Sequence, residues 1–598
     1  MTLVDRRDLD FLLYEMLDVA ALLAQERFSS LDRAVVSEML DTAQSMAEDL
    51  YWPCAATLDA TEPKFVDGAV DVLPEVGVAL RAYAEAGFFA QTFDAEEGGL
   101  QFPFVVSMAI NGMFSCANLA ITNYSMLTIA AAHLLSKFGS EQQKARFLRP
   151  MLEGRWFGTM CLSESQAGSS LADIRTSAEP VGDGTYQIRG SKMWISGGEH
   201  DLSENIIHMV LAKIPGGPPG IRGISLFIVP KFLVNDDGLS GTRNNIELVG
   251  LNHKMGQRGT SNCMLNFGEG GPSVGYLVGD PHAGLACMFH MMNEARINVG
   301  HGAVMSGLSG YLYALSYSRH RLQGRPVGRK DPASPQVPII EHADVRRMLL
   351  AQKAAVEGGL ALCLFCASLV DQQRLVTSAK EKHDLQLLLE VLTPVAKSWP
   401  AEHCLEANKL AIQVLGGAGY MREHPVERFY RDNRLNHIHE GIFGIQGLDL
   451  LGRKVRLEGG RGLDLILTRI EGTISDAVSD PSLVSYATQL RALLVDLSAA
   501  TRACLDCTDT ERSLANATLY LDAFGHVVVG WLWLRQAMVA TLAMSDAEPH
   551  DHSFYTGKIA ACRYFFRYVL PHAATTLALV QSLDDTCLAV RPEEFQSG

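Results

Sequence analysis

The spacing of apolar residues changes near residue 158 and changes back near Gly284, and this switch limits the folds open to the chain. Over residues 7–154 apolar side chains recur every three or four positions, which predicts helices. Over residues 185–196 (TYQIRGSKMWIS) they nearly alternate, and residues 223–233 (GISLFIVPKFL) are rich in β-branched and aromatic types, so both stretches predict strands. We therefore expect an α+β fold that is mainly α, with a β segment inserted between helical segments.

Glycine and proline mark the connections between these elements. We expect a loop between helices at residues 93–103 (FDAEEGGLQFP), a hairpin turn at 181–184 (VGDG) and a longer loop at 215–220 (PGGPPG). A further interruption with Pro and Gly runs from 324 to 338. The predicted domains are an N-terminal helical domain (1–157), a middle β domain (158–278), a C-terminal helical domain (279–462) and an extra helical block (463–598).

Charge and composition exclude several classes of protein. The chain has 598 residues, a formal net charge of -16 and no Lys/Arg-rich run, so it is not expected to bind nucleic acid. Its cysteines lie in apolar contexts, as at Cys161, Cys287 and Cys562, which fits a reducing cytoplasm. The N-terminus lacks the features of a signal peptide. Polar residues interrupt the most apolar stretch, 524–544, so we expect a buried helix and no membrane span.

The run RLNHIHEGIFGIQGLDLLGRK (434–454) brings two histidines and a carboxylate together. His437, His439 and Glu440 lack the separation of four that two zinc-binding histidines on a helix need, and no HExxH occurs in the chain, so no metal is expected. The two Cys-x-x-Cys pairs lie in helical stretches and are expected in the core. Glu440 is then either an acid at a helix N-terminus or a general base.

The glycine-rich stretch LGGAGY (415–420) could let a phosphate approach main-chain amides, or could simply end a helix. It lacks the strand and helix context of a dinucleotide-binding turn. No GxxxxGK[ST] is present and no GxSxG stands at a strand-to-helix elbow, so the P-loop and hydrolase interpretations have no support. Taken alone, this stretch leaves both of its interpretations open.

Five motifs follow one another along the chain: MCLSESQAGSS (160–170), KMWISGG (192–198), MGQRG (255–259), QVLGGAGY (413–420) and HEGIFGIQ (439–446). Together they resemble the acyl-CoA dehydrogenase family, over about residues 93–454. The extra N-terminal helices, ISGGEHDLSENIIH (195–208) and the long C-terminal block resemble its larger bacterial members, such as the 3-methylmercaptopropionyl-CoA and long-chain acyl-CoA dehydrogenases. The resemblance implies an acyl-CoA dehydrogenase fold, with a β-barrel-like middle domain, a C-terminal four-helix bundle and an extra helical domain.

The resemblance also implies a reaction and its base. In this family a carboxylate removes a proton α to a thioester while a flavin accepts hydride from the β carbon, and the weak carbon acid requires a base held in place. By motif, Glu440 is that base, its backbone amide helps to hold the thioester oxygen, and FAD is the cofactor. A dry, apolar site raises the proton affinity of a carboxylate toward neutral pH. The implied activity is conversion of an acyl-CoA into trans-2-enoyl-CoA, as in fatty acid β-oxidation, with electrons passed to an electron-transferring flavoprotein.

The family match assigns further residues to the FAD. The residues expected to contact it are Met160, Leu162, Ser163, Gly168, Ser169, Trp194, Ile195, Ser196, Arg321, Gln323, Gln413, Gly416, Gly417, Ile442 and Gly444. Ser163 and Ser196 would bond the polar edge of the ring, and Trp194 would cover its face. Arg321 and Gln323 resemble residues that reach the FAD of a neighbouring subunit, as do Gln413 and the two glycines after it. A homodimer is therefore expected.

The same match assigns residues to the acyl-CoA. They are Ser169, Asn293, Arg296, His439 and Gly441. Asn293 would lie on the pantetheine side, and Arg296 would orient Glu440.

Three positions depart from the family pattern. Residues 163–165 (SES) stand where Thr-Glu-Pro is usual, 168–170 (GSS) where Gly-Ser-Asp is usual, and 439–442 (HEGI) where Tyr-Glu-Gly-Thr is usual. Ile442 cannot make the hydrogen bond of a threonine, so these changes bear on the substrate more than on the reaction. The rival interpretations are an oxidase-like flavoprotein that oxygen reoxidises, and a non-catalytic flavin- or DNA-binding relative. The acidic charge and the presence of Glu440 count against the second.

Overall fold

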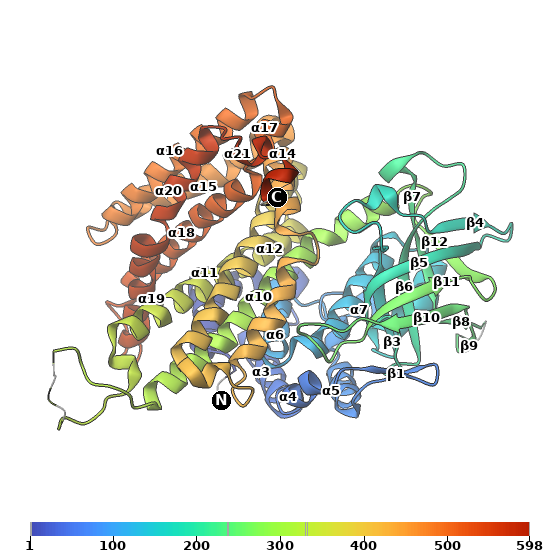
Figure 1. The fold of residues 1–598 in the computed structure, drawn as a ribbon, viewed down its shortest axis with the longest axis horizontal. Coiled ribbons are helices and arrows are strands. Elements are labelled where there is room, and N and C mark those ends of the chain that lie inside the picture. The colour runs from blue at the N-terminus through green and yellow to red at the C-terminus, as the bar shows by residue number, and fades with distance from the viewer. Residues whose placement is uncertain (1–2, 236–237, 329–330, 332, 597–598) are drawn as a thin grey trace. The chain divides into compact units, whose positions relative to one another are not determined.

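The computed structural model describes residues 3–235, 238–328, 331 and 333–596. The chain divides into two units, which we call the sheet unit (Leu23–Ala295) and the helical unit (Met1–Leu22 with Arg296–Gly598). All of the described strands belong to the sheet unit; in Figure 1 the strands of the main sheet are the green and cyan arrows, and the β1 hairpin is blue. The change of apolar spacing near residue 158 therefore marks the start of the main sheet, as predicted.

Helices form the first half of the sheet unit. They are α3 (Arg33–Met46), α4 (Ala55–Ala60), α5 (Pro74–Glu85), α6 (Phe104–Ala117), α7 (Leu119–Phe138), α8 (Glu141–Gln143) and α9 (Arg149–Leu152), after α2 (Val19–Leu23). The predicted loop at 93–103 separates the short helix at Phe88–Ala90 from α6 and holds one more short turn at Ala95–Glu97. A hairpin of β1 (Lys64–Val66) and β2 (Ala69–Asp71) interrupts the region predicted to be helical throughout.

The main sheet of this unit closes on itself. Its strands are β3 (Trp156–Cys161), β4 (Ser177–Pro180), β5 (Tyr186–Ser196), β6 (Asn205–Lys213), β7 (Ile224–Pro230), β10 (Ile246–Leu251), β11 (Asn262–Phe267) and β12 (Ser273–Val278). They pair in the order β10-β11-β5-β12-β7-β6-β3, and β4 pairs with both β5 and β6. The ring β5-β12-β7-β6-β4 makes the sheet barrel-like, as predicted. A small separate sheet joins β8 (Phe232–Val234) to β9 (Ser240–Arg243).

Strands β6 and β7 are buried on both faces, and their residues alternate between two cores. Met209 of β6 and Ile228 of β7 belong to the core that includes residues of α7 and α9, whereas Val210 and Phe227 belong to the core inside the barrel. Side chains of a strand point to opposite faces in turn, so one strand supplies both cores. The predicted turn at 181–184 joins β4 to β5, and the loop at 215–220 lies between β6 and β7.

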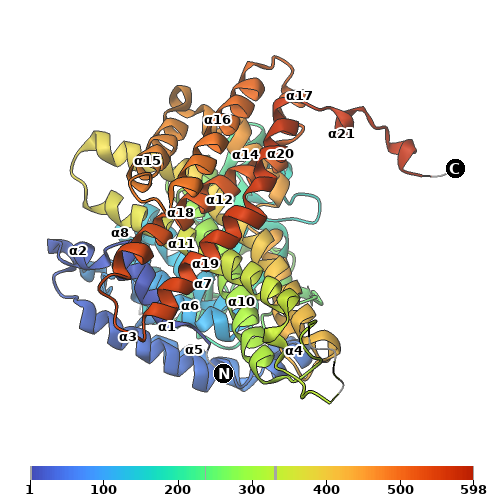
Figure 2. The ribbon, with the colours of Figure 1, turned by 90° about the vertical axis from the view of Figure 1, so that its left-hand side faces the viewer.

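The helical unit consists of long helices and short connecting turns. After α10 (Gly284–His320), which begins in the sheet unit, come α11 (Ala343–Leu375), α12 (Ala379–Leu415), α13 (Val426–Asn433) and α14 (Phe443–Gly452). The C-terminal block comprises α15 (Arg461–Ala477), α16 (Val484–Asp506), α17 (Thr510–Leu514), α18 (Ala517–Ala543), α19 (His552–Tyr564), α20 (Pro571–Gln581) and α21 (Thr586–Ala589). Figure 2 shows α16 and α20 running alongside each other, with the segment of α21 leading away from them.

The N-terminal helix α1 (Arg6–Asp10) and the π-helical turn after it (Phe11–Met16) pack in the helical unit. Arg7 forms an ion pair with Asp551 at 2.9 Å and donates a hydrogen bond to the hydroxyl of Tyr555 at 2.9 Å. Residues at the two ends of the chain therefore belong to one packed unit. No local sequence pattern signals this association.

Three helices in the described part of the chain are long and apolar enough to cross a membrane: Leu119–Phe138, Ala343–Leu375 and Thr510–Ala543. Their apolar windows are 61%, 94% and 83% buried within the protein, so their hydrophobic residues are used largely in packing. The stretch 524–544, predicted to be a buried helix, lies mostly in α18. Of the two Cys-x-x-Cys pairs, Cys363, Cys366 and Cys504 are buried on helices, whereas Cys507 directly follows α16 and is only partly buried.

Candidate active site

Glu440 lies on a sharp turn between the short helix at Arg434–His437 and α14. Its φ is 54°, and that of Gly441 is 95°, so two successive residues adopt left-handed backbone. A Cβ at position 441 would lie 2.6 Å from Nε2 of Gln446, and this nitrogen donates a hydrogen bond to the Glu440 carbonyl at 2.8 Å. Left-handed backbone costs a non-glycine residue about 1 kcal/mol and is typical of functional turns.

The turn also bears on the interpretation of Glu440 as an acid at a helix N-terminus. The N-cap of α14 is Ile442, and the first turn of that helix carries no acidic residue. Glu440 lies two residues before the cap, and its carboxylate makes no hydrogen bond within the described chain. Glu440 therefore does not act as an N-terminal helix acid, and the general-base interpretation remains.

The carboxyl of Glu440 is desolvated and faces two cations. Burial raises its pKa above the ordinary value of 4.5, while Arg296 and Lys397 act in the opposite direction. Burial lowers the pKa of Lys397 to about 8, against the attraction of Glu440. A carboxyl whose pKa is raised toward neutrality suits a base that must take a proton from a weak carbon acid.

Arg296 on α10 is held in place by an acid on another helix. Its Nη1 donates to Oδ2 of Asp449 at 3.0 Å, and Asp449 belongs to α14, which follows the Glu440 turn. Arg296 is 5% exposed. Arg296 is thus fixed to the helix that follows the Glu440 turn, and its charge acts on the Glu440 carboxyl.

His439 is directed into a buried chain of amides. Its Nε2 donates to Oδ1 of Asn436 at 3.0 Å, Asn436 donates to Asn433 at 3.0 Å, and Asn433 donates to Asn408 at 2.7 Å. Burial lowers the pKa of His439 to about 3, so the ring is neutral and Nε2 carries the proton. The three asparagines fix the ring, and with it the turn. The sequence did not predict this role, although Asn436 lies three residues before His439 and Asn433 four residues before His437.

The residues 437–440 do not converge on a common point for a metal. The ring of His437 stacks on Phe443, with centroids 5.1 Å apart and planes at 7°, and its Nε2 lies 2.5 Å from a carboxylate oxygen of Glu402. The His439 ring points instead to Asn436.

A different group, His403, Asp522 and His526, has ligand atoms within 4.8 Å of one another. The His403 Nε2 donates to Asp522 Oδ1 at 2.9 Å, and the His526 Nδ1 to the Asp522 carbonyl at 2.8 Å. Because both nitrogens already have acceptors, this group is better explained as a hydrogen-bond network that joins α12 to α18.

In the sheet unit, Met160 lies on β3, and the loop after it is anchored to β5. Glu164 accepts hydrogen bonds from Lys192 Nζ at 2.9 Å and from the hydroxyl of Thr176 at 2.6 Å. Burial alone would raise the pKa of Glu164, but Lys192 and these hydrogen bonds lower it to about 2. The amide of Met193 donates to the Ser163 carbonyl at 3.0 Å. The predicted FAD contacts Leu162 and Ser163 therefore stand on a fixed loop.

Several predicted FAD residues of this unit present free surface. Trp194 is 54% exposed although it lies on a central strand, and its φ of 61° is left-handed. Gly168 and Ser169 are exposed, and a Cβ on Gly168 would meet no atom within 4 Å. The Ser196 hydroxyl accepts a hydrogen bond from Asn262 at 3.1 Å. The Ile195 side chain is buried in the barrel core, so only its main chain is available to a ligand.

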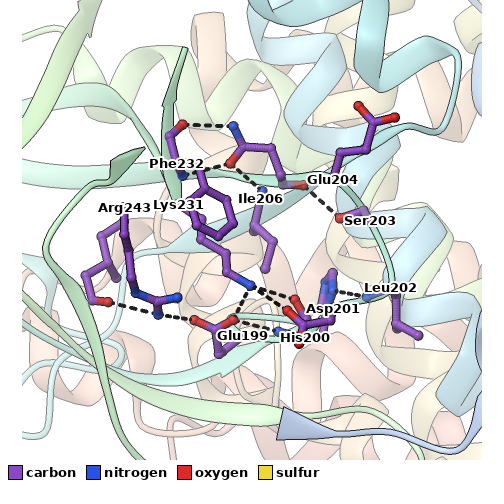
Figure 3. Close-up of polar contacts among 12 residues, drawn as sticks. Glu199, His200, Asp201, Leu202, Ser203, Glu204, Ile206, Lys231, Phe232 and Arg243 are labelled. Carbon is purple, nitrogen blue, oxygen red and sulfur yellow. Dashed lines mark hydrogen bonds and ion pairs between the residues drawn. The ribbon is translucent and has the colours of Figure 1, made fainter. Parts of the chain in front are cut away.

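The loop after the Trp194 strand is fixed by buried charges (Figure 3). Lys231 Nζ lies 2.5 Å from Glu199 and donates to the His200 carbonyl at 2.8 Å. Arg243 donates to the second oxygen of Glu199 at 2.6 Å. The charged residues of the stretch ISGGEHDL (195–202) therefore have a structural role, which is to anchor the chain directly after Ser196.

The predicted residues for a neighbouring subunit's FAD lie on the surface of the helical unit. Arg321 and Gln323, just after α10, are exposed, as are Gln413, Gly416 and Gly417 at the end of α12. Added Cβ atoms on both glycines would meet nothing within 4 Å.

The other predicted contacts are less open. Ile442 is 44% exposed, Gly444 is partly buried near Thr518, and Asn293 on α10 is partly buried in the sheet unit.

Comparison with known families covers most of the chain. Residues 36–155, 159–269 and 282–454 match the models of the N-terminal, middle and C-terminal domains of acyl-CoA dehydrogenase. Residues 466–591 match the acetyl-CoA dehydrogenase C-terminal like domain. The chain belongs to the acyl-CoA dehydrogenase family. It is an oxidoreductase that acts on acyl-CoA, as its family's members do.

Curated relatives span nearly the whole chain. A 3-methylmercaptopropionyl-CoA dehydrogenase of Ruegeria pomeroyi is 36% identical over 92% of this chain and 94% of its own length. The broad-specificity linear acyl-CoA dehydrogenase FadE5 of Mycobacterium tuberculosis is 32% identical over 98% of this chain and 99% of its own. The resemblance to the larger bacterial members, and with it the extra C-terminal domain, is confirmed.

Solved structures confirm the fold. Caenorhabditis elegans ACDH-11, in complex with C11-CoA, has a TM-score of 0.74 at 18% identity and covers 98% of this chain and 94% of its own. An acyl-CoA dehydrogenase of Bacillus anthracis complexed with FAD has a TM-score of 0.72 at 20% identity, covering 92% and 88%. Acyl-CoA dehydrogenases depend on FAD, so FAD is the cofactor of this chain. The exposed face of Trp194 and the open backbone at Gly168 fit a flat ring system and its phosphates.

Proposed function

We propose that this acyl-CoA dehydrogenase converts an acyl-CoA thioester into its trans-2-enoyl thioester, with Glu440 as the base. The state of Glu440 carries the proposal. Its carboxyl lies on a left-handed turn, desolvation raises its pKa, and no hydrogen bond within the described chain engages it. A carboxylate oxygen of Glu440 takes the proton that leaves the α carbon, and FAD supplies the acceptor for the hydride that leaves the β carbon.

The protein's own residues prepare this step. Gln446 fixes the Glu440 carbonyl and so the Glu440–Gly441 peptide, which directly follows the Glu440 amide that would face the thioester oxygen. In the sheet unit, Trp194, Ser163 and Ser196 would hold the FAD ring. Gly168, which has no side chain, would let the main chain of the protein approach the FAD. Arg321 and Gln413 would reach the FAD of a second copy of this chain.

The proposed substrate is an acyl-CoA whose α and β carbons carry no substituent that would keep Glu440 away from the α proton. The proposed electron acceptor is an electron-transferring flavoprotein. Relatives named for 3-methylmercaptopropionyl-CoA, linear acyl-CoA and butyryl-CoA support an unbranched acyl chain. Ile442, where the family pattern has threonine, lines the turn beside the base and adds apolar surface there.

The direct test is the rate of flavin bleaching by acyl-CoAs of graded length, for the wild type and for Glu440→Gln. The variant keeps the shape of the side chain and lacks the base, so FAD and acyl-CoA should still bind while flavin reduction falls by about three orders of magnitude or more. Near-normal reduction by the variant would exclude Glu440 as the base. Turnover with oxygen alone, compared with turnover with an artificial electron acceptor, separates a dehydrogenase from an oxidase.

A further inference from the structure

Lys397 is a fully buried lysine in the middle of α12, and its side chain ends at the turn that carries Glu440. Its Nζ donates a hydrogen bond to the Gly441 carbonyl at 2.7 Å. An ammonium group has three donors, and within the described residues this carbonyl is the only acceptor at hydrogen-bond distance. A buried charge with one hydrogen bond is costly unless a counter-charge lies nearby.

Other charged groups near this turn already have partners. Arg296 of α10 is paired with Asp449 of α14 at 3.0 Å, and Lys454, after α14, is paired with Glu390 of α12. The ring of His439 is neutral. Lys397 has no carboxylate within ion-pair distance in the described chain, and its electrostatic attraction is to Glu440.

Two successive carbonyls of this turn, those of Glu440 and Gly441, are therefore held by residues of two different helices. Gln446 of α14 binds the carbonyl of Glu440, and Lys397 of α12 binds the carbonyl of Gly441. Two anchored carbonyls hold a left-handed pair of residues that would otherwise relax. The ammonium that makes the second anchor also acts on the base electrostatically.

We propose, building on the role of Glu440 as the base, that Lys397 is a positioning residue. It holds the 439–441 turn through the Gly441 carbonyl, and its charge keeps the Glu440 carboxylate ionised at neutral pH until the substrate arrives. When Glu440 takes the α proton, the ammonium keeps its own proton and its bond to Gly441, so only the proton from the α carbon moves.

The test uses the FAD-loaded enzyme and the variant Lys397→Met, which removes charge and donor at nearly constant volume. Lys409→Met is the matched control, because Lys409 lies on the same helix, is largely exposed and pairs with Glu406. Without the nearby cation, Glu440 holds its proton to higher pH. We expect the acid limb of the pH profile of flavin reduction to move up by about one pH unit, and the rate at pH 7 to fall about tenfold or more.

Lys397→Gln, which keeps an N–H donor and lacks the charge, and Lys397→Arg, which keeps the charge, are measured in parallel. A shifted acid limb in the glutamine variant and a wild-type limb in the arginine variant support the proposal. A wild-type limb in any uncharged variant that retains FAD overturns it. Loss of FAD from both uncharged variants, with a normal Lys409→Met, also overturns it, because Lys397 is then needed for the fold.

The same assays separate this proposal from the proposed function. If Glu440→Gln is inactive and Lys397→Met has a wild-type profile, only the role of Lys397 fails. If Glu440→Gln reduces FAD normally, the assignment of the base fails, and a shift in the Lys397 variants reports on another group.

Discussion

Lys558 on α19 forms a buried ion pair with Asp8 of α1, although the two residues are separated by almost the whole chain. Lys558 also donates to Glu357 of α11 at 2.9 Å, and Glu357 pairs with Lys353. One ammonium thus neutralises two carboxylates that are both buried. Burial, followed by the nearby Glu357, raises the pKa of Asp8 to about 6.

Lys558→Met should destabilise the helical unit strongly, and more at pH 8 than at pH 5. Removing the ammonium leaves Lys353 as the cation beside Asp8 and Glu357 in the described part of the chain, and a broken buried pair costs about 3–5 kcal/mol. An acid whose folded pKa is raised loses stability as pH rises from its ordinary pKa to its folded pKa, which for Asp8 is from 3.8 to about 6. Lys558 lowers the pKa of Asp8, so in its absence this pKa rises further and the loss extends above pH 6. Thermal unfolding at both pH values, with Lys409→Met as the exposed control, measures this; an equal change at both pH values contradicts it.

Glu440→Gln should not lower the thermal midpoint at pH 8.5 and should raise it slightly. Desolvation raises the folded pKa of Glu440, so the ionised group opposes folding above that pKa and not below its ordinary value of 4.5. At pH 8.5 Lys397, with a pKa of about 8, is mostly neutral and loses little when the carboxylate is removed. The gain should vanish near pH 4.5. Melting curves of the FAD-loaded proteins at the two pH values check the sign, and a lower midpoint at pH 8.5 is inconsistent with it.

Local sequence patterns predict much of the fold because burial imposes a period on them. The alternation in residues 185–196 became β5, and the helical spacing after Gly284 became α10 and its successors. The β1–β2 hairpin was not predicted, since Phe65 and Val66 are 44% and 50% exposed and give no alternating signal. The pairing of Asp8 with Lys558 was out of reach as well, because no local pattern links residues 550 positions apart.

In the candidate site, too, local motifs predict some residues, while others are found only from contacts in the fold. The motif order identified Glu440, and the structure adds what surrounds it. Lys397 lies in a helical run where a lysine is usually a solvated residue, and only the packing of α12 against the turn shows that it is buried. Asn408 and Asn433 are 25 residues apart and meet only in the fold.

Trp194→Gly should leave the apoprotein as stable as the wild type and remove much of its FAD. The side chain is 54% exposed and its φ of 61° is left-handed, so glycine relieves about 1 kcal/mol of backbone strain and little packing is lost. The proposed cover of the flavin ring disappears, so FAD content after gel filtration should fall several-fold. Phe65→Ala, which removes another exposed aromatic ring of the sheet unit, is the control. Full FAD retention by Trp194→Gly would remove Trp194 from the proposed site.

Tyr420→Arg should separate the proposed homodimer. Tyr420 is 86% exposed and follows Gly416 and Gly417, and Met421 beside it is 52% exposed. Two large apolar side chains next to residues expected to reach a partner's FAD are what a contact between copies would cover. An arginine there would place like charges against each other across a two-fold contact, so sedimentation velocity should show a monomer at low micromolar concentration.

The FAD content should fall together with the dimer, because Gln413 and the two glycines would no longer meet a second subunit's cofactor. Val495→Arg is the control, since Val495 is 66% exposed on α16, away in sequence from these residues. A Tyr420→Arg protein that remains dimeric with full FAD would place the contact elsewhere. A monomer that keeps its FAD would instead show that each chain completes its own cofactor site, and Gln413 would lose its proposed role.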